Sequence, residues 1–325
     1  MSVRSWKTIK IGELGRVVTG KTPTTQDLNN FGNTYPFITP RDMTGQKKIS
    51  NTERFLSEKG MLSVKNCLLP PDAICVSCIG SDMGKVVMTT QNSVTNQQLN
   101  SIICNTSFDP NFVYYAIIKI SDELRNTAHH STAVPILNKT AFSNFKIGAP
   151  DLPTQTRIAA ILSALDDKIE LNRRTNATLE AIAQAIFKEW FVDFRFPGAT
   201  GEMKDSELGP IPRGWRIGKL GEIYQTTSGG TPNRTHPEYY QDGNTNWIKS
   251  KELTGSFVTE TEEKITEQAV KKSSAKILPA YSVLIAMYGA NVGNYGITSM
   301  ESTCNQAICA FIPSEQYPYS FIYHF

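Results

Sequence analysis

Two stretches of the chain carry residue types whose spacing matches that of known chemical sites. Residues 15–22, read as Gly-Arg-Val-Val-Thr-Gly-Lys-Thr, match the phosphate-binding loop pattern letter for letter. That loop needs a helix beginning at its Lys-Thr, so that backbone amides can cradle phosphates. Pro23 follows directly and disfavours helical geometry at Thr22. We therefore interpret Gly20–Pro23 as a turn, and keep a nucleotide-binding enzyme using Gly15–Thr22 as an alternative.

The second stretch places Asp151 after Pro150 and then Asp166 two residues before Lys168, a spacing found in some metal-dependent nucleases. Such carboxylates must converge on one Mg²⁺ ion. In a helix, Asp166 and Lys168 would lie about 200° apart around the axis. The sequence therefore predicts no nuclease site here.

Other candidates for catalysis also fail. On a strand, Cys75 and Cys78 would point to opposite faces, which predicts buried thiols rather than a metal or redox site. The four histidines show no ligand spacing, and no serine-nucleophile elbow is present. We expect no catalytic residue, no metal and no cofactor in this chain. Its residues favour recognition.

The chain repeats itself at an offset of 215 − 6 = 209 residues, which relates Trp6 to Trp215. The other motifs shared at or near this offset are Gly12-Glu13 with Gly221-Glu222, Gly20-Lys21-Thr22-Pro23 with Gly229-Gly230-Thr231-Pro232, Leu69-Pro70 with Leu278-Pro279, Gly80 and Gly84 with Gly289 and Gly293, Asn96-Gln97 with Asn305-Gln306, and, one residue further, Ile38 with Ile248. Two similar domains in one chain suit a target with two separated halves, such as the half-sites of duplex DNA.

Composition bounds these possibilities. The chain has 325 residues, 40% of them hydrophobic and 19% charged, with a net charge of +3. These values are typical of a globular protein with room for two domains, and the charge permits nucleic-acid binding without arguing for it. No apolar run approaches the roughly 20 residues of a membrane span. We expect a cytoplasmic protein without a membrane partner.

The pattern of apolar residues, glycines and prolines along the chain predicts an α+β fold with two similar strand-rich domains separated by a long, coiled-coil-like spacer helix. The expected parts are residues 1–150, with a short helix near 112–120, a spacer helix over 151–196, a linker over 197–214 and an incomplete second domain over 215–325. Residues 155–194 contain neither Gly nor Pro. About 35 residues make a rod of roughly 50 Å. Its apolar stripe, at steps of three and four, comprises Ile158, Leu162, Leu165, Ile169, Asn172, Asn176, Leu179, Ala183, Ile186 and Trp190.

The stripe predicts a partner helix. Asn172 and Asn176 lie in its middle, where polar residues can fix the register of paired helices. The alternative is that both side chains face water at a bend of the helix.

These features together resemble the specificity subunits of type I restriction–modification systems. The motifs that carry the resemblance are Trp6, Ile11–Leu14, Gly20–Pro23, Asn96-Gln97, Ser131-Thr132 with Lys139, Pro150–Gln155, the helix pattern from Ile158 to Ile169, Ile186–Phe194 and Pro210–Trp215. The resemblance implies that each target recognition domain reads one half of a bipartite sequence of double-stranded DNA. It also implies that the conserved helix docks two methyltransferase subunits, which the restriction (motor) subunits join. A 50 Å rod would span on the order of 15 base pairs.

The end of the chain departs from that family pattern. Phe325 corresponds to Ala116 of the first copy, so a counterpart of residues 117–195 is missing. We expect a shortened product whose exposed spacer helix can self-associate.

The residues expected to contact DNA are polar residues in turns shared by both copies. They are Lys21, Thr22, Arg41, Asp42, Lys85, Gln97 and Gln98 in the first copy, and Arg234, Lys249, Lys251, Asn291 and Asn294 in the second. Lys21 and Lys85 are expected to meet phosphates. Asn96 and Asn305 either join this set or cap a turn in each domain. A coiled-coil scaffold for proteins, without a DNA role, remains a third interpretation.

Overall fold

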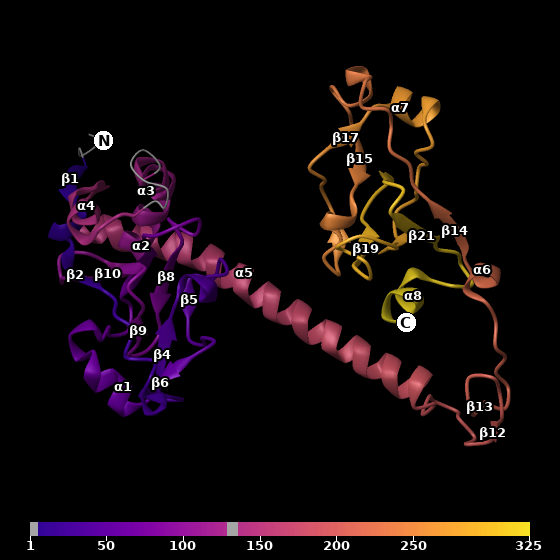
Figure 1. Cartoon of the computed structure of the whole chain (residues 1–325), viewed down its shortest axis with the longest axis horizontal. Helices are drawn as coiled ribbons and strands as arrows, with labels where there is room; N and C mark the ends of the chain where they lie inside the picture. Colours follow the sequence, from indigo (N-terminus) through magenta and orange to yellow (C-terminus); the bar gives the residue numbers. More distant parts are fainter. Residues whose placement is uncertain (1–5, 129–135) are drawn as a thin grey trace. The chain divides into compact units, whose positions relative to one another are not determined.

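A computed structural model describes residues 6–128 and 136–325 of the chain (Figure 1). Ser131 and Thr132, two of the residues behind the family resemblance, lie outside the described residues. The chain divides into two compact units, Met1–Asn176 and Ala177–Phe325, called the first and second domain below. Each is α+β, as the sequence predicts.

The first domain is built around a five-stranded sheet in the order β2-β10-β7-β8-β5 and a four-stranded sheet in the order β3-β6-β4-β9, while β1 pairs with β11. Its strands are β1 Lys7–Lys10, β2 Gly15–Thr19, β3 Phe31–Gly32, β4 Tyr35–Ile38, β5 Lys48–Ile49, β6 Phe55–Leu56, β7 Ile74–Ser77, β8 Val86–Thr89, β9 Val94–Thr95, β10 Leu99–Cys104 and β11 Lys146–Ala149. Its helices are α1 Glu58–Ser63, α2 Pro110–Lys119, α3 Ser121–Ala128, α4 Lys139–Asn144 and the start of α5, Leu152–Phe187. The predicted helix near 112–120 is confirmed as α2.

The second domain repeats the order of the five-stranded sheet, and its smaller sheet repeats the pairing of β6, β4 and β9 without an equivalent of β3. Its sheets follow the orders β14-β21-β18-β19-β16 and β17-β15-β20, with β16 parallel to β19 and β15 parallel to β20, as β5 is to β8 and β4 to β9. The strands are β12 Met203–Lys204, β13 Ile211–Pro212, β14 Gln225–Ser228, β15 Thr245–Ile248, β16 Phe257–Val258, β17 Lys264–Ile265, β18 Val283–Ala286, β19 Tyr295–Thr298, β20 Ser302–Cys304 and β21 Ile308–Ile312. The helices are α6 Leu220–Ile223, α7 Glu267–Lys272 and α8 Tyr319–His324.

The repeated motifs mark equivalent contacts in the two domains. Thr89 is fully buried, and its hydroxyl donates to the carbonyl of Pro70 at 2.7 Å; Thr298 does the same to Pro279 at 2.7 Å. The same hydroxyl-to-carbonyl bond is therefore formed at equivalent places before β7 and β18. Gly84 and Gly293 have φ of 87° and 85°, a left-handed conformation that favours glycine. The duplication seen in the sequence is therefore a duplication of structure.

Strand β1 of the first domain is one of those that have no equivalent strand among the described residues of the second. Residues 216–219 are equivalent to β1 at the 209-residue offset, yet they form no strand. In the first domain β1 bonds only to β11, from Lys7 opposite Ala149 to Lys10 opposite Lys146. A strand needs a partner for its backbone, and the sheets of the described residues give residues 216–219 none.

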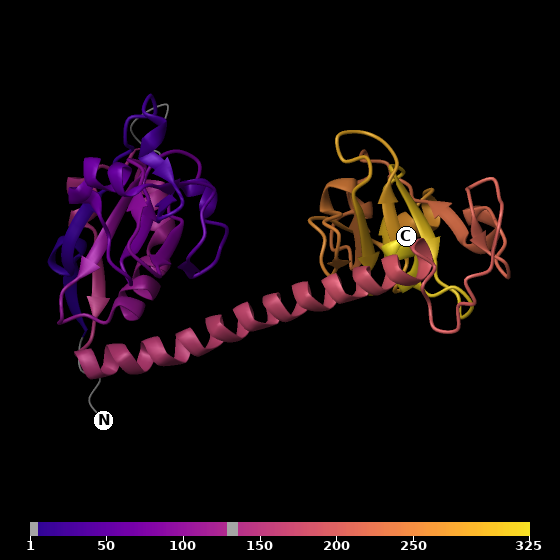
Figure 2. The same ribbon diagram turned by 90° about the horizontal axis from the view of Figure 1, so that it is seen from below.

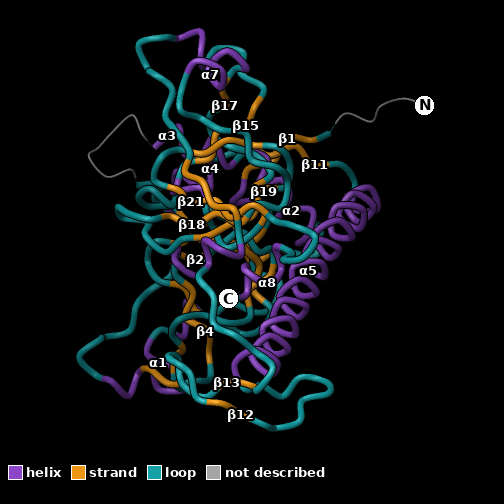
Figure 3. The backbone as a smooth tube through the Cα atoms, turned by 90° about the vertical axis from the view of Figure 1, so that its right-hand side faces the viewer, coloured by secondary structure: helices purple, strands orange, loops and turns teal. Residues whose placement is uncertain are grey.

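Helix α5 confirms the predicted long helix and begins three residues earlier than the glycine- and proline-free stretch (Figures 2 and 3). Asp151 accepts a hydrogen bond from the amide of Thr154 at 3.1 Å and so caps the helix N-terminus. A π-helical turn, Lys188–Val192, follows its last residue. The described helices include none that is long and apolar enough to cross a membrane.

Side-chain hydrogen bonds hold the first part of α5 on the first domain. Lys47 donates to the hydroxyl of Ser163 at 2.6 Å, and the Tyr115 hydroxyl donates to Asp166 at 2.6 Å. The last part of α5 packs on the second domain, where the rings of Phe187 and Phe321 lie 5.6 Å apart. The two compact units divide inside α5, after Asn176, and the boundaries at residues 151 and 197 stay a prediction.

The segment expected as a plain linker, residues 197–214, contains a two-stranded hairpin of β12 and β13. Trp215 follows it and packs against Phe194 and stacks on Phe196, with ring centroids 5.4 Å and 5.6 Å apart. The many Gly and Pro residues of this segment thus form the turns of a small ordered element. Aromatic packing anchors it to the end of the spacer.

Candidate nucleic-acid interface

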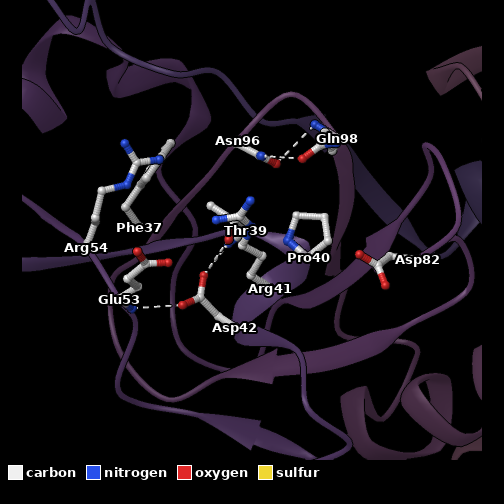
Figure 4. A pocket seen from close by; sticks show the side chains of 10 residues that line it. All are labelled: Phe37, Thr39, Pro40, Arg41, Asp42, Glu53, Arg54, Asp82, Asn96 and Gln98. Atoms are coloured by element: carbon white, nitrogen blue, oxygen red, sulfur yellow. Dashed lines mark hydrogen bonds between the residues drawn. The ribbon is translucent and has the colours of Figure 1, made fainter. Parts of the chain in front are cut away.

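Turns at one edge of the first domain enclose a polar hollow of about 570 Å³ (Figure 4). Its walls come from the turn after β4, the residues before β6, the turn before β8 and the turn between β9 and β10. The lining residues are Phe37, Thr39, Pro40, Arg41, Asp42, Glu53, Arg54, Asp82, Asn96 and Gln98. Three of the predicted DNA contacts, Arg41, Asp42 and Gln98, therefore come together here from distant parts of the sequence.

Asp42 braces this hollow from within. One carboxylate oxygen accepts from the amide and the hydroxyl of Thr39, each at 2.7 Å, and the other accepts from the amide of Glu53 at 2.8 Å. These bonds hold the turn after β4 against the segment before β6. Asp42 thus positions the neighbouring side chains, a role that the sequence alone does not indicate.

Three cations lie at the hollow. Arg41 is exposed. Lys85 pairs with Asp82 at 2.8 Å and donates to the carbonyl of Pro40 at 3.4 Å. Arg54 was not predicted, and its guanidinium lies over the rings of Phe31 and Phe37, 5.4 Å and 5.3 Å from their centroids. Arginine over an aromatic face is held in orientation while its N–H groups stay available.

The remaining predicted residues of the first domain lie on the adjoining turns. The Thr22 hydroxyl donates to the side chain of Gln97 at 2.7 Å, and the backbone amide of Lys21 donates to Thr95 at 2.9 Å, leaving the Lys21 side chain exposed. A side chain at Gly20 would meet the carbonyl of Asn96 at 2.2 Å, which explains the glycine. The turn with Lys21 is therefore pressed against the turn that lines the hollow.

Asn96 has the structural role that the sequence left open. Its side-chain oxygen accepts from the backbone amide of Gln98 at 3.1 Å. In the second domain, Asn305 accepts in the same way from the amide of Ala307 at 3.2 Å. Both asparagines cap the turn between the equivalent strands.

The second domain brings its predicted cations together at the equivalent place. Lys249 contacts Glu262 at 2.8 Å and Glu263 at 2.7 Å, and Lys251 contacts Glu262 at 2.6 Å. Arg234 binds Glu263 through two bonds of 2.5 Å and 2.9 Å. These carboxylates were not predicted as part of the site, because their closeness to the cations depends on the pairing of β15 with β17.

The other predicted residues of the second domain lie on the turn before β19. The amide of Asn291 donates to the hydroxyl of Ser250 at 3.4 Å, and the backbone of Asn294 donates to the carbonyl of Asn291 at 2.9 Å. This turn is the equivalent of the one that carries Lys85. Thr231 and Gln306 are also hydrogen-bonded, as Thr22 and Gln97 are.

The acidic partners in the second domain remain ionised across ordinary pH. Hydrogen bonds from Lys249 and Lys251 lower the pKa of Glu262 to about 2. Bonds from Arg234 and Lys249 lower the pKa of Glu263 to about 2 as well. An anion that binds Arg234 or Lys249 must therefore displace these carboxylates or share the cation with them.

The motifs set aside in the sequence do not form catalytic sites. Residues Gly15–Thr19 form strand β2, and no helix follows at residues 20–24, so the nucleotide-binding alternative is wrong. Asp166 accepts from Tyr115, away from Asp151 at the helix cap. Burial raises the pKa of Cys75 to about 12, which makes it an unreactive thiol. The described residues include no cluster of His, Cys, Asp and Glu suited to a metal.

Comparison with known proteins decides the family. The model of the protein family described as "Type I restriction modification DNA specificity domain" matches this chain twice, over residues 4–181 and 212–325. This chain belongs to that family. The specificity subunit of the type I restriction enzyme MjaIX from Methanocaldococcus jannaschii is 29% identical over 297 residues, covering 89% of this chain and 67% of its own length. The HindI specificity subunit from Haemophilus influenzae is 25% identical over 386 residues, covering 98% and 81%.

The fold is likewise that of a known specificity subunit. The crystal structure of the type I restriction–modification S subunit from M. genitalium superposes with a TM-score of 0.54 at 15% identity, covering all of this chain and 77% of the other. The two matches of the specificity domain coincide with the two repeats found at the 209-residue offset.

In this specificity-domain protein, the apolar stripe of α5 is largely uncovered. Ile158 packs on the core of the first domain and Leu162 is half-buried. The exposed members are Leu165, Ile169, Asn172, Asn176, Leu179, Ile186 and Trp190. Near the helix end, Ile186 and Trp190 line an apolar hollow of about 680 Å³ with Phe321 of the second domain. Such a continuous apolar surface is typical of an interaction site.

Proposed function

We propose that this chain reads a two-part sequence of duplex DNA for a type I restriction–modification complex, one half of the target contacting each domain. The observation that carries the proposal is the recurrence of one polar, cation-bearing edge at the equivalent place in both domains. A protein that used only one domain for recognition would not need to keep the edge in both. Its membership of the specificity-domain family supports the same function.

The chemistry of the complex is assigned to other subunits. We propose that this chain is non-catalytic and binds no cofactor, and that methyltransferase subunits modify the bases while restriction subunits translocate and cleave. The exposed apolar stripe of α5 is the surface on which we expect two methyltransferase subunits to dock. Supporting this, Leu165, Ile169 and Leu179 are 59%, 49% and 58% exposed, values that favour a helical partner.

The direct test is selection of DNA from a random-sequence duplex library by the full chain assembled with the methyltransferase subunits of its own system. We expect two short conserved blocks separated by unspecified positions. Selection of no sequence by an assembled complex would contradict the DNA-reading function and favour a protein scaffold. A nucleotide-binding assay on the isolated chain should find no ATP bound.

We also propose that the isolated chain self-associates through the same stripe when no other subunit covers it. Burying these side chains against a second copy would remove them from water. Light scattering should give a mass above that of one chain at micromolar concentration. Replacing both Leu165 and Leu179 by Gln should return it to a monomer, whereas a wild-type monomer would rule the contact out.

A further inference from the structure

Both domains carry a guanidinium on a pair of aromatic rings at the edge described above. In the first domain Arg54 covers Phe31 and Phe37. In the second, Arg234 covers Tyr240 and Trp247, 4.6 Å and 5.3 Å from the ring centroids. Tyr240 follows Phe31 by 209 residues, and Trp247 follows Phe37 by 210, the same one-residue drift that relates Ile38 to Ile248. The two aromatic pairs are therefore equivalent.

The two arginines come from different parts of the fold. Arg54 precedes β6, and its carbonyl accepts from the amide of Phe37 at 3.0 Å. The equivalent residue before β17 is Glu263, whose carbonyl accepts from the amide of Trp247 at 3.3 Å. Arg234 instead reaches the aromatic pair from the loop between β14 and β15. The same guanidinium position is thus filled by residues that are not equivalent in sequence.

The aromatic pairs are rigid supports. Phe37 is fully buried and Trp247 is 3% exposed. The Trp247 indole donates to the carbonyl of Gly230 at 3.0 Å, and the Tyr240 hydroxyl donates to Pro232 at 2.6 Å. The arginine side chains above them stay accessible, since Arg54 is exposed and the Arg234 side chain is 56% exposed. A supported guanidinium loses little freedom when it binds a ligand.

We infer that the guanidinium on the aromatic pair is the specificity-determining cation of each domain, supplied by Arg54 in the first and by Arg234 in the second, and that each selects a guanine in its half of the target. This inference rests on the proposed DNA-reading function. An arginine fork binds both major-groove acceptors of guanine, O6 and N7, and no other base offers that pair to two donors.

The two readers differ in what holds them. Among the described residues, no carboxylate pairs with Arg54. Arg234 is fixed by Glu263, which uses both carboxylate oxygens on it. Glu263 is therefore a positioning residue for the second domain, and its loss should affect one half of the target only. Arg54 needs no such residue because two Phe rings support it.

The experiment repeats the selection from random-sequence duplexes with the full assembled complex carrying Arg54→Lys, Arg234→Lys or Glu263→Gln. Lysine keeps the charge but loses the planar fork. We expect Arg54→Lys to lower the preference for guanine at one position of one half by roughly 5- to 150-fold. The other half should not change. Arg234→Lys and Glu263→Gln should both lower the preference for guanine in the half of the target that contacts the second domain.

Arg174→Lys is the matched control, since Arg174 lies on α5 and pairs with Glu170. It should leave the selected sequence unchanged. Arg54→Gln gives a second measurement, because an amide favours adenine over guanine. The inference is overturned if the lysine variants keep every wild-type base preference, or if they weaken binding equally on all sequences, as a phosphate contact would. A wild-type complex that selects no sequence would instead refute the proposed function itself.

Discussion

Neutralising Glu263 should strengthen the salt dependence of DNA binding by the second domain. Glu263 holds Arg234 at 2.5 Å and 2.9 Å and Lys249 at 2.7 Å. In Glu263→Gln the amide carries no charge and no longer holds Arg234 in its base-reading position, so both cations become available to phosphates. Lowering the pH cannot reproduce the effect, because the pKa of Glu263 is about 2 and the carboxylate stays ionised well below neutrality.

The magnitude follows from the number of cations released. Each phosphate neutralised adds about 0.9 to the slope of log K against log salt. Arg234 is released completely, whereas Lys249 keeps its contact with Glu262 at 2.8 Å. The slope should therefore steepen by about 0.9 to 1.8. Between 50 and 200 mM salt, this adds a loss of affinity of roughly 3- to 12-fold.

Fluorescence anisotropy on a mixed-sequence duplex, measured over that salt range with the assembled complex, gives the slope directly. Glu53→Gln is the matched control, since it removes the same charge from the equivalent edge of the first domain, where no described cation is paired with Glu53. If Glu263→Gln and Glu53→Gln show the same slope, then Arg234 and Lys249 do not reach phosphates and the reasoning fails.

Three further outcomes are expected. Lys21→Ala should weaken binding about equally across sequences and reduce the salt slope by about 0.9, because the Lys21 side chain is exposed at the turn; an unchanged slope in the same anisotropy assay would remove Lys21 from the DNA contacts. Thr89→Val should lower the free energy of unfolding of the first domain by about 2–5 kcal/mol, since it leaves the buried amide of Ala73 and the carbonyl of Pro70 without their hydroxyl partner. Thr89→Ser keeps the hydroxyl and, in the same urea titration, should lower the free energy of unfolding by less than about 1.5 kcal/mol. The fold should also lose stability as pH rises from 9 toward 12, because burial raises the pKa of Cys75 and Cys304 to about 12 while the thiols of the unfolded chain ionise near pH 9. Urea titrations of the double variant Cys75→Ala, Cys304→Ala should show a weaker dependence of stability on pH over this range.

Local sequence was sufficient for the features that depend on neighbours along the chain. Residues 155–194 lack helix breakers and repeat apolar side chains every three or four positions, so they predict α5 wherever the rest of the chain lies. The proline after Thr22 disfavoured a phosphate-binding loop because it acts on the adjacent residue. The internal repeat predicted two domains of one topology, since equal motifs at equal spacing fold alike.

The candidate sites depend on distances between residues far apart in the sequence. Arg54 was missed because nothing beside it in the sequence shows that Phe31 and Phe37 lie beneath its guanidinium; that placement follows from the pairing of β4 with β6. Asp42 was predicted to contact DNA, and only the tertiary structure shows that its carboxylate accepts hydrogen bonds from the amides of Thr39 and Glu53.

Sequence by itself thus determined the long helix, the repeat and the turns, because each arises from steric and hydrogen-bonding preferences within a few residues. Tertiary structure decided which cations are held by carboxylates and which rest on aromatic rings. It also decided which short segments pair as strands, because a strand needs a partner to satisfy its backbone. Charge pairing and strand pairing both act through space, and the order of residues along the chain does not contain those distances.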